Sequence, residues 1–300
     1  MLTLRSRQAR RALLLVIACF VAGTAAAQQA RSFKDVAYAT VNGKPIALDL
    51  YLPANVKTPP LVVYLHGGTW KDGDKTRYPA FLVARGFAVA SLDFRSTNEA
   101  PFPANVHDIK AGIRFLRAKA AEYGYRTDRI ALMGASSGGH LAAEVGVTGG
   151  NAELEGKLGD YLAQSSRVQA IVSYFGASNL TTILAQSTPA GLKVREPALV
   201  LLLGALPDKV PELAQLASPV FHVDKGDPPL LLLHGDQDAQ MPINQSHELQ
   251  GGYERLGLDV DFLVVHDIGH MPPTVFETGP FAQGEPVERV VKFLRRTIGE

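Results

Sequence analysis

Cysteine is almost absent from this sequence: Cys19 is the only one in 300 residues. One cysteine excludes an intrachain disulfide, and no Cys pair or His-Glu-x-x-His stretch is present to hold a zinc ion. A phosphate-binding Gly-x-x-x-x-Gly-Lys-Ser/Thr loop and a dinucleotide-binding glycine fingerprint are missing too. The eight histidines are scattered along the chain. We therefore expect neither a metal nor a cofactor.

The chain also has little net charge. Its formal charge is +1, which gives no electrostatic reason to expect nucleic-acid binding. Apolar residues make up 46% and charged residues 20%, which is ordinary for a soluble globular protein. A chain of 300 residues is long enough for one large α/β domain or two small ones.

The N-terminal segment differs from the rest in composition. Arginines without any acidic residue precede an apolar run over Ala12–Ala22, and Thr24–Ala27 supplies an Ala-x-Ala site. This pattern predicts a signal peptide over 1–27, cleavage after Ala27, and a secreted or periplasmic domain over 28–300. The apolar run is short for a membrane span, so we expect no stable span. Lipidation at Cys19 and an uncleaved anchor stay open as alternatives.

Apolar runs of strand length alternate with helix-like stretches after this segment. The expected strands are Val36–Thr40, Ile46–Tyr51, Leu61–Leu65, Phe87–Leu92, Ile130–Met133, Val168–Phe175, Pro229–Leu233 and Val260–Val265, the first two joined by a turn at Asn42-Gly43. The expected helices are Tyr78–Arg85, Phe102–Tyr123, His140–Val147, Asn244–Leu256 and Pro286–Ile298. The alternation predicts one doubly wound α/β domain with a mostly parallel sheet and helices on both faces.

Residues 179–223 interrupt this alternation. They contain no strong strand signal, only helix-like pieces over Ala198–Leu203 and Glu212–Leu216. Because they follow a strand at the edge where α/β enzymes insert lids, we read them as a small cap insertion. Ordinary packing helices on the sheet face are the alternative. Within the Phe102–Tyr123 helix, Asp108 and Arg114 are expected to be surface charges.

Gly134 to Gly138 form the motif Gly-x-Ser-x-Gly between a predicted strand and a predicted helix. This context suits a nucleophile elbow, in which Ser136 sits at a strained turn and the flanking glycines avoid backbone clashes. The N–H of Ser137 would then point toward a developing oxyanion. A chance match is the alternative, and the partners of the serine decide against it.

Three further strands end in polar loops at the same predicted edge: His66–Trp70, His234–Asp238 and His266–His270. The order of nucleophile, acid and histidine matches α/β hydrolases, so Asp238 would orient His270, the base for Ser136. Asp236 and His266 are the rivals within these loops. Asp236 is expected to brace its loop and His266 to pack behind the strand. His66 and His234 are likewise expected to brace loops, and His247 to face solvent.

The His66-Gly67-Gly68 turn directly after a buried strand would bring a second N–H donor to the oxyanion. A simple tight turn is the alternative for this stretch. Trp70, the only tryptophan, would line the substrate pocket or else lie in the core.

Together the stretches HGGTW, DFRSTNEAPFPANVHDIKAGIRFL, DRIALMGASSGGHLAA, ASPVFHVDKGDPPLLLLHGDQD and the late GH resemble α/β-hydrolase carboxylesterases. The resemblance is to the BD-FAE-like esterases, a sister group of the hormone-sensitive-lipase family, and it covers about Val36 to Leu294. It implies a catalytic triad of Ser136, Asp238 and His270. It also implies oxyanion donors at Gly68 and Thr69 with Ser137, although Thr69 replaces the third glycine of the wider family.

The resemblance implies a serine esterase acting on small-molecule or polysaccharide-linked esters, since family members hydrolyse acyl and feruloyl esters. An amidase or peptidase on the same triad is one alternative. The HGG-x-W stretch also resembles kynurenine formamidases, but the expected export argues against that cytosolic role. A non-catalytic α/β-hydrolase relative that binds a ligand is the alternative from another class. The oligomeric state and the acyl preference are not fixed by the sequence.

Overall fold

The computed structural model describes residues 30–271 and 275–299 of the chain. The predicted signal peptide, its cleavage site and Cys19 therefore lie outside the described residues. Among the described residues, no helix combines the length and the apolar character needed to cross a membrane.

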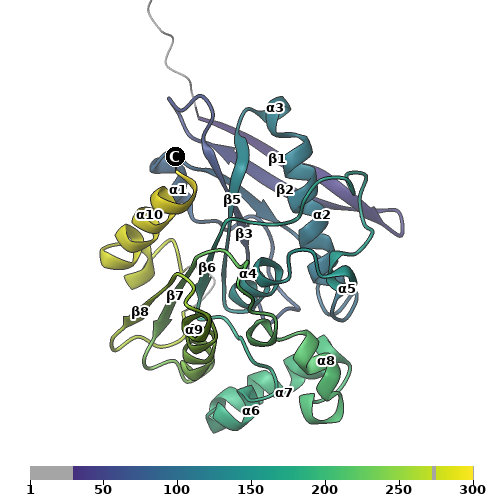
Figure 1. The fold of residues 1–300 in the computed structure, drawn as a ribbon, viewed down its shortest axis with the longest axis vertical. Helices are drawn as coiled ribbons and strands as arrows, with labels where there is room; N and C mark the ends of the chain where they lie inside the picture. The colour runs from purple at the N-terminus through teal and green to yellow at the C-terminus, as the bar shows by residue number, and fades with distance from the viewer. Residues whose placement is uncertain (1–29, 272–274, 300) are drawn as a thin grey trace, which may run out of the picture.

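A single eight-stranded sheet runs through the molecule in the order β1-β2-β4-β3-β5-β6-β7-β8 (Figure 1). Its strands are β1 (Arg31–Val41), β2 (Lys44–Leu52), β3 (Pro60–Leu65), β4 (Ala88–Leu92), β5 (Arg126–Ala135), β6 (Ala170–Tyr174), β7 (Leu230–Gly235) and β8 (Val260–Val265). β1 and β2 pair antiparallel, β2 pairs antiparallel with β4, and all later pairs are parallel. The predicted mostly parallel sheet is confirmed.

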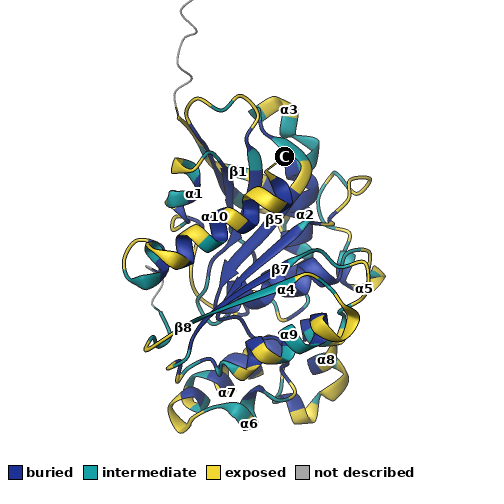
Figure 2. Ribbon diagram, turned by 60° about the vertical axis from the view of Figure 1, so that its left-hand side comes forward, coloured by how far each residue is buried: buried dark blue, intermediate teal, exposed yellow. Residues whose placement is uncertain are grey.

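Helices cover both faces of the sheet. α2 (Ala104–Ala118), α4 (Ser137–Val147) and α9 (Asn244–Leu256) pack on one face, while α1 (Ala80–Ala84) and α10 (Glu285–Ile298) pack on the other. In β3, Leu61, Val63 and Leu65 face the first layer, and Val62 and Tyr64 face the second. Because both faces are buried, the central strands are continuous apolar runs (Figure 2).

The segment between β6 and β7 carries α6 (Ile183–Gln186), α7 (Pro189–Leu203), η1 (Pro207–Lys209), α8 (Pro211–Leu216) and η2 (Pro219–Phe221). We call residues 183–221 the α6–α8 segment. It gathers at the end of the molecule far from α3 (Ala120–Tyr123) and from the C-terminal end of the chain (Figures 1 and 2). The helices α5 (Ala152–Glu155) and η3 (Pro280–Ala282) complete the described elements.

The α6–α8 segment docks on the loop that follows β7. The Thr188 hydroxyl caps α7 by accepting from Gly191 N–H at 3.0 Å, and it donates to the Ala239 carbonyl at 2.7 Å. At the other end of α7, the Leu202 carbonyl accepts from Phe102 N–H at 2.9 Å. The role of this segment as a cap over the site stays a prediction.

Two predicted surface charges on α2 are buried instead. Asp108 has no exposed surface and accepts from the Arg95 guanidinium at 2.6 Å and from Arg95 N–H at 2.8 Å. Arg114 is 3% exposed and donates to Glu155 at 3.0 Å. The prediction was wrong because their partners lie in loops and helices distant in the sequence, which supply the charge that permits burial.

Candidate active site

Ser136 occupies a sharp turn between β5 and α4. Its φ of +55° is one that residues with a side chain rarely adopt, and its N–H donates to the Tyr174 carbonyl at 2.9 Å. A Cβ added at Gly134 would lie 2.1 Å from the Gly138 carbonyl oxygen. A Cβ added at Gly138 would lie 2.2 Å from the Leu65 carbonyl oxygen. The predicted strand–turn–helix context of the motif is therefore present, and both glycines are sterically required.

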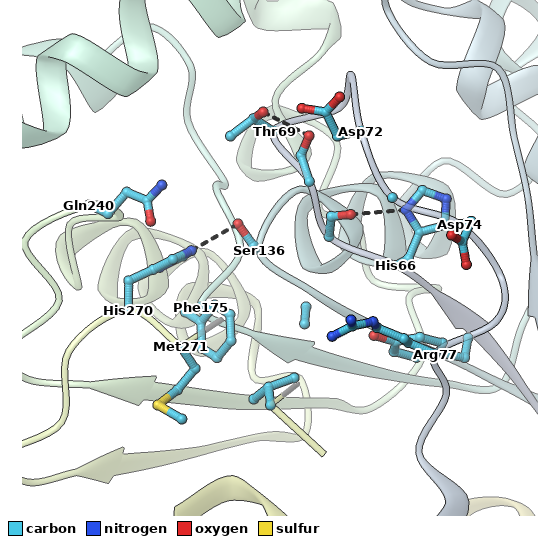
Figure 3. Close-up of a pocket in the computed structure, with 16 residues that line it drawn as sticks. His66, Thr69, Asp72, Asp74, Arg77, Ser136, Phe175, Gln240, His270 and Met271 are labelled. Atoms are coloured by element: carbon cyan, nitrogen blue, oxygen red, sulfur yellow. Dashed lines mark hydrogen bonds between the residues drawn. The ribbon is translucent and has the colours of Figure 1, made fainter. Parts of the chain in front are cut away.

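Three predicted side chains form one chain of hydrogen bonds at the carboxyl ends of β5, β7 and β8. His270 Nε2 lies 3.1 Å from Ser136 Oγ, and His270 Nδ1 lies 2.7 Å from Asp238 Oδ2 (Figure 3). An ionised carboxylate only accepts hydrogen bonds, so Nδ1 carries the proton and Nε2 presents its lone pair to the serine. The structure thus brings together residues that are 102 and 32 positions apart in the sequence.

The surroundings of Asp238 keep its carboxyl ionised. Burial alone would raise its pKa, but hydrogen bonds from His234 and His270 and from the Met241 N–H outweigh burial and leave the pKa well below its usual range. The second carboxylate oxygen, Oδ1, accepts from Gln240 N–H at 2.9 Å and from Met241 N–H at 2.7 Å. A fixed negative charge is therefore held beneath His270.

The rival residues form a separate pair. His266 Nδ1 lies 2.8 Å from Asp236 Oδ2, and Asp236 also accepts from Asp267 N–H at 2.8 Å. Asp236 therefore braces the loop, as predicted. His266 is exposed rather than packed behind the strand, so that expectation was wrong. The side chain points outward because β8 is the edge strand and its face is only half-buried.

Of the other histidines, His66 and His234 brace loops and His247 faces solvent, as predicted. His66 donates from Nδ1 to the Gly67 carbonyl at 2.9 Å and stacks on Phe94. His234 donates from Nε2 to the Met241 carbonyl at 3.0 Å and accepts from Ser246 Oγ at 2.8 Å. His247 is exposed on α9.

The loop after β3 passes close to the serine. A Cβ added at Gly67 would lie 3.4 Å from Ser136 Cβ. The N–H groups of Gly68 and Thr69 donate to no other residue in the described part of the chain. Ser137 is the first residue of α4, where N–H groups have no partner within the helix. These three N–H groups are the ones that we predicted to be oxyanion donors.

A cavity of about 480 Å³ opens beside Ser136 and His270. Its wall includes the apolar side chains of Phe175, Met271 and Val275. In Figure 3, Gln240 and Arg77 lie on opposite sides of Ser136. Phe175, Gln240 and Met271 follow strand ends or adjoin the predicted site residues, so the strand-end rule could have found them. Arg77 lies in a loop with no motif.

Trp70 does not line this cavity, which corrects its assignment to the substrate pocket. Only 1% of its surface is exposed, and its indole N–H donates to His140 Nδ1 at 3.0 Å. The side chain turns inward because buried partners on α4 and α7 satisfy its polar and aromatic groups. In the described residues we find no cluster of three or more His, Cys, Asp or Glu that could hold a metal ion.

The sheet order and the geometry of this site define a class of protein, those with the α/β-hydrolase fold. Within this class the chain belongs to the BD-FAE family, whose model matches residues 48–252. The predicted resemblance to BD-FAE-like esterases is thereby confirmed.

Known proteins similar to this chain carry esterase names. Esterase LipC of Mycobacterium tuberculosis is 28% identical over 194 residues, which are 63% of this chain and 47% of LipC. The probable isoprenylcysteine alpha-carbonyl methylesterase ICMEL1 of Arabidopsis thaliana is 33% identical over 217 residues, 70% of this chain and 45% of the relative. The chain thus spans about half the length of these curated relatives.

A solved structure is similar over nearly its whole length. The truncated form of a carbohydrate esterase from gut microbiota matches with a TM-score of 0.80 and 31% identity, covering 90% of this chain and 97% of that one. The similarity therefore includes both the sheet and the helices that surround the site.

Proposed function

We propose that this protein is a serine carboxylesterase that works through an acyl-enzyme. The observation that carries the proposal is the continuous hydrogen-bond chain Ser136–His270–Asp238 at the edge of a cavity. A serine hydroxyl is a weak nucleophile, and a neutral imidazole held in one tautomer is the base that activates it. The esterase names of the relatives support the same reading.

The proposed reaction has two halves. Ser136 Oγ attacks the ester carbonyl while His270 Nε2 takes the hydroxyl proton, and the same proton then passes to the departing alcohol as the ester bond breaks. Water attacks the resulting acyl-serine, gives a proton to His270, and releases the acid, while His270 returns the proton to Ser136. Asp238 stabilises the imidazolium that forms in each half.

The N–H groups of Gly68, Thr69 and Ser137 would receive the carbonyl oxygen as it gains negative charge. Their lack of other partners in the described structure supports this role. Preorganised donors of this kind stabilise the transition state more than the substrate, and each one removed costs about 3–4 kcal/mol of barrier.

The substrate class we propose is a carboxylic ester with a small, largely apolar acyl group. Phe175, Met271 and Val275 offer an apolar wall beside the serine, while the cavity also has polar side chains. A carbohydrate alcohol is the leaving group favoured by the likeness to the carbohydrate esterase.

The first experiment is a panel of p-nitrophenyl esters of increasing acyl length, with matching anilides, on the wild type and on Ser136→Ala. We expect short esters to be hydrolysed by the wild type, anilides to react far more slowly, and Ser136→Ala to lose turnover. Faster anilide than ester turnover would favour an amidase. Absence of both turnover and fluorophosphonate labelling in the wild type would overturn the proposal in favour of a binding protein.

We further propose that the protein is exported and cleaved after Ala27, on the composition of residues 1–27. N-terminal sequencing of the protein recovered from the periplasm or medium tests this. A mature N-terminus at Gln28 is expected, whereas a lipid-modified Cys19 or an intact leader would contradict it.

A further inference from the structure

The loop that carries the proposed oxyanion donors has an unfavourable backbone conformation. Thr69 has a φ of +54° and Trp70 a φ of +62°, so two successive residues with side chains adopt the left-handed conformation. Such a conformation persists only where surrounding contacts hold it. The backbone bonds are few: the Trp70 carbonyl accepts from Thr97 N–H, and the Gly68 carbonyl accepts from Lys71 and Asp72 N–H.

The side chain of Trp70 is fixed from two sides. Its Nε1–H donates to His140 Nδ1 at 3.0 Å, and the Arg195 guanidinium lies 5.8 Å from its ring centroid. Trp70, His140 and Arg195 are each at most 1% exposed. The indole therefore has no freedom to turn without breaking a buried hydrogen bond.

His140 also contacts the α6–α8 segment. Its Nε2 lies 2.8 Å from the Ala217 carbonyl, directly after α8. Tryptophan only donates and a carbonyl only accepts, so the tautomer is fixed: Nδ1 accepts and Nε2–H donates. Burial lowers the pKa of His140 to about 4, which keeps the ring neutral near pH 7 and preserves both bonds.

We propose that His140 is a positioning residue that ties the α6–α8 segment to Trp70 and thereby holds the Gly68–Thr69 donors at the oxyanion position. The proposal rests on the proposed esterase function. His140 touches no reacting atom; it acts through the indole. Without it the left-handed Thr69–Trp70 backbone is free to relax toward the commoner negative φ, which would turn the donors away.

The test uses three substitutions assayed with the p-nitrophenyl ester that the wild type hydrolyses fastest. His140→Leu removes both hydrogen bonds, Trp70→Phe removes the indole N–H while keeping an aromatic ring, and His140→Gln keeps one acceptor and one donor. His247→Leu, at an exposed position of α9, is the matched control.

We expect His140→Leu and Trp70→Phe each to lower kcat about 10- to 100-fold with KM changed less than about twofold, because the lost stabilisation belongs to the transition state. Both should weaken binding of a boronic acid, whose tetrahedral adduct needs the donors, in proportion to kcat/KM. The double variant should be no worse than His140→Leu alone, since both substitutions break the same Trp70–His140 hydrogen bond. His140→Gln should recover most of kcat, and His247→Leu should match the wild type.

Wild-type kcat in Trp70→Phe, or additive losses in the double variant, would overturn the proposal. A rise in KM alone would do the same. Equal losses in His140→Gln and His140→Leu that follow their melting temperatures would show a merely structural role. If His140→Leu does not fold, Trp70→Phe and His140→Gln decide. Ser136→Ala runs in parallel: a wild type as inactive as Ser136→Ala would mean that the esterase proposal, and this inference with it, has failed.

Discussion

At the scale of single residues, the two acid–histidine pairs near the carboxyl ends of β7 and β8 show how location decides chemistry. Asp238 and Asp236 are two positions apart, and His270 and His266 four. Asp238 is 9% exposed, and His270 is half-buried next to Ser136. His266, by contrast, faces solvent. Only the first pair has a serine within hydrogen-bond distance.

Replacing the two acids by asparagine should therefore have opposite outcomes. Asp238→Asn should lower kcat by about 10³- to 10⁴-fold, because an amide no longer stabilises the imidazolium or fixes its tautomer. Asp236→Asn should keep kcat within about twofold of the wild type, since it only removes a loop contact. Steady-state kinetics on the two purified variants distinguishes them, and a greater loss in Asp236→Asn would mean that the acid has been misassigned.

Glu144 on α4 is a buried carboxyl whose two oxygens have no hydrogen-bond partner in the described residues. Burial raises its pKa well above the usual value, although Lys110 acts in the opposite direction. His222 Nε2, 3.7 Å away, already donates to the Leu216 carbonyl at 2.8 Å. Burial without a hydrogen-bond partner therefore favours the neutral form of the Glu144 carboxyl in the folded state.

A raised folded-state pKa contributes stability below the unfolded-state value near 4.5, and this contribution declines as the pH rises. Glu144→Gln should accordingly be more stable than the wild type at pH 8, by about 1–3 kcal/mol, and similar to it at pH 4. Urea unfolding at both pH values measures the difference. A stability gap that stays constant with pH would contradict a protonated Glu144.

The residue contacts explain which parts of the site could be predicted from the sequence. Ser136, Asp238 and His270 were predictable because each lies at a strand end that a local pattern marks. Trp70, Asp108 and Arg114 were not, since their burial depends on His140, Arg95 and Glu155, which nothing local connects to them. Long-range pairing of polar groups has no periodic signature in a single sequence.

At the scale of elements, the junction of β5 and α4 has no space for a side chain at its glycines. A side chain at Gly134 would meet backbone atoms of Gly138 and Gly139, which no rotamer change can relieve. On α9, by contrast, a Cβ at Gly251 would meet only the flexible end of Arg255 at 3.5 Å.

Two alanine substitutions test this difference. Gly134→Ala should abolish labelling of Ser136 and destabilise the fold by about 3 kcal/mol or more, by analogy with overpacked cores. Gly251→Ala should keep full activity and raise stability by about 0.5–1 kcal/mol, because alanine favours the helix. Thermal denaturation and active-site titration report both effects, and an active Gly134→Ala enzyme would refute the elbow geometry.

The Asp108–Arg95 pair joins α2 to the loop after β4. Asp108→Ala leaves the partly exposed Arg95 guanidinium and the Arg95 N–H without their acceptor, so it should cost about 1–3 kcal/mol of unfolding free energy. Glu288, which pairs with Arg85 at the surface, is the control: Glu288→Ala should leave the melting temperature unchanged. Chemical denaturation measures the unfolding free energy of the two variants. Equally small losses in both would show that the Asp108–Arg95 pair contributes no more to stability than a surface ion pair.

At the scale of the whole molecule, the fold was more predictable than the placement of its insertion. The strands were recognisable because both sheet faces are buried and each strand is a continuous apolar run. The helix Phe102–Tyr123 was predicted as one element, but Lys119 separates α2 from α3. The α6–α8 segment contacts the loop after β7 through Thr188 and contacts α4 through the Ala217 carbonyl, rather than packing on a single sheet face.

The central claim is that Ser136 carries the acyl group during turnover. The most direct measurement is mass spectrometry of the protein quenched with acid milliseconds to seconds after mixing with a slowly deacylated p-nitrophenyl ester. A mass increase equal to one acyl group, located on the peptide that contains Ser136 and absent in Ser136→Ala, is the predicted result. Continued ester turnover by Ser136→Ala, or an acyl group on another residue, would contradict the account.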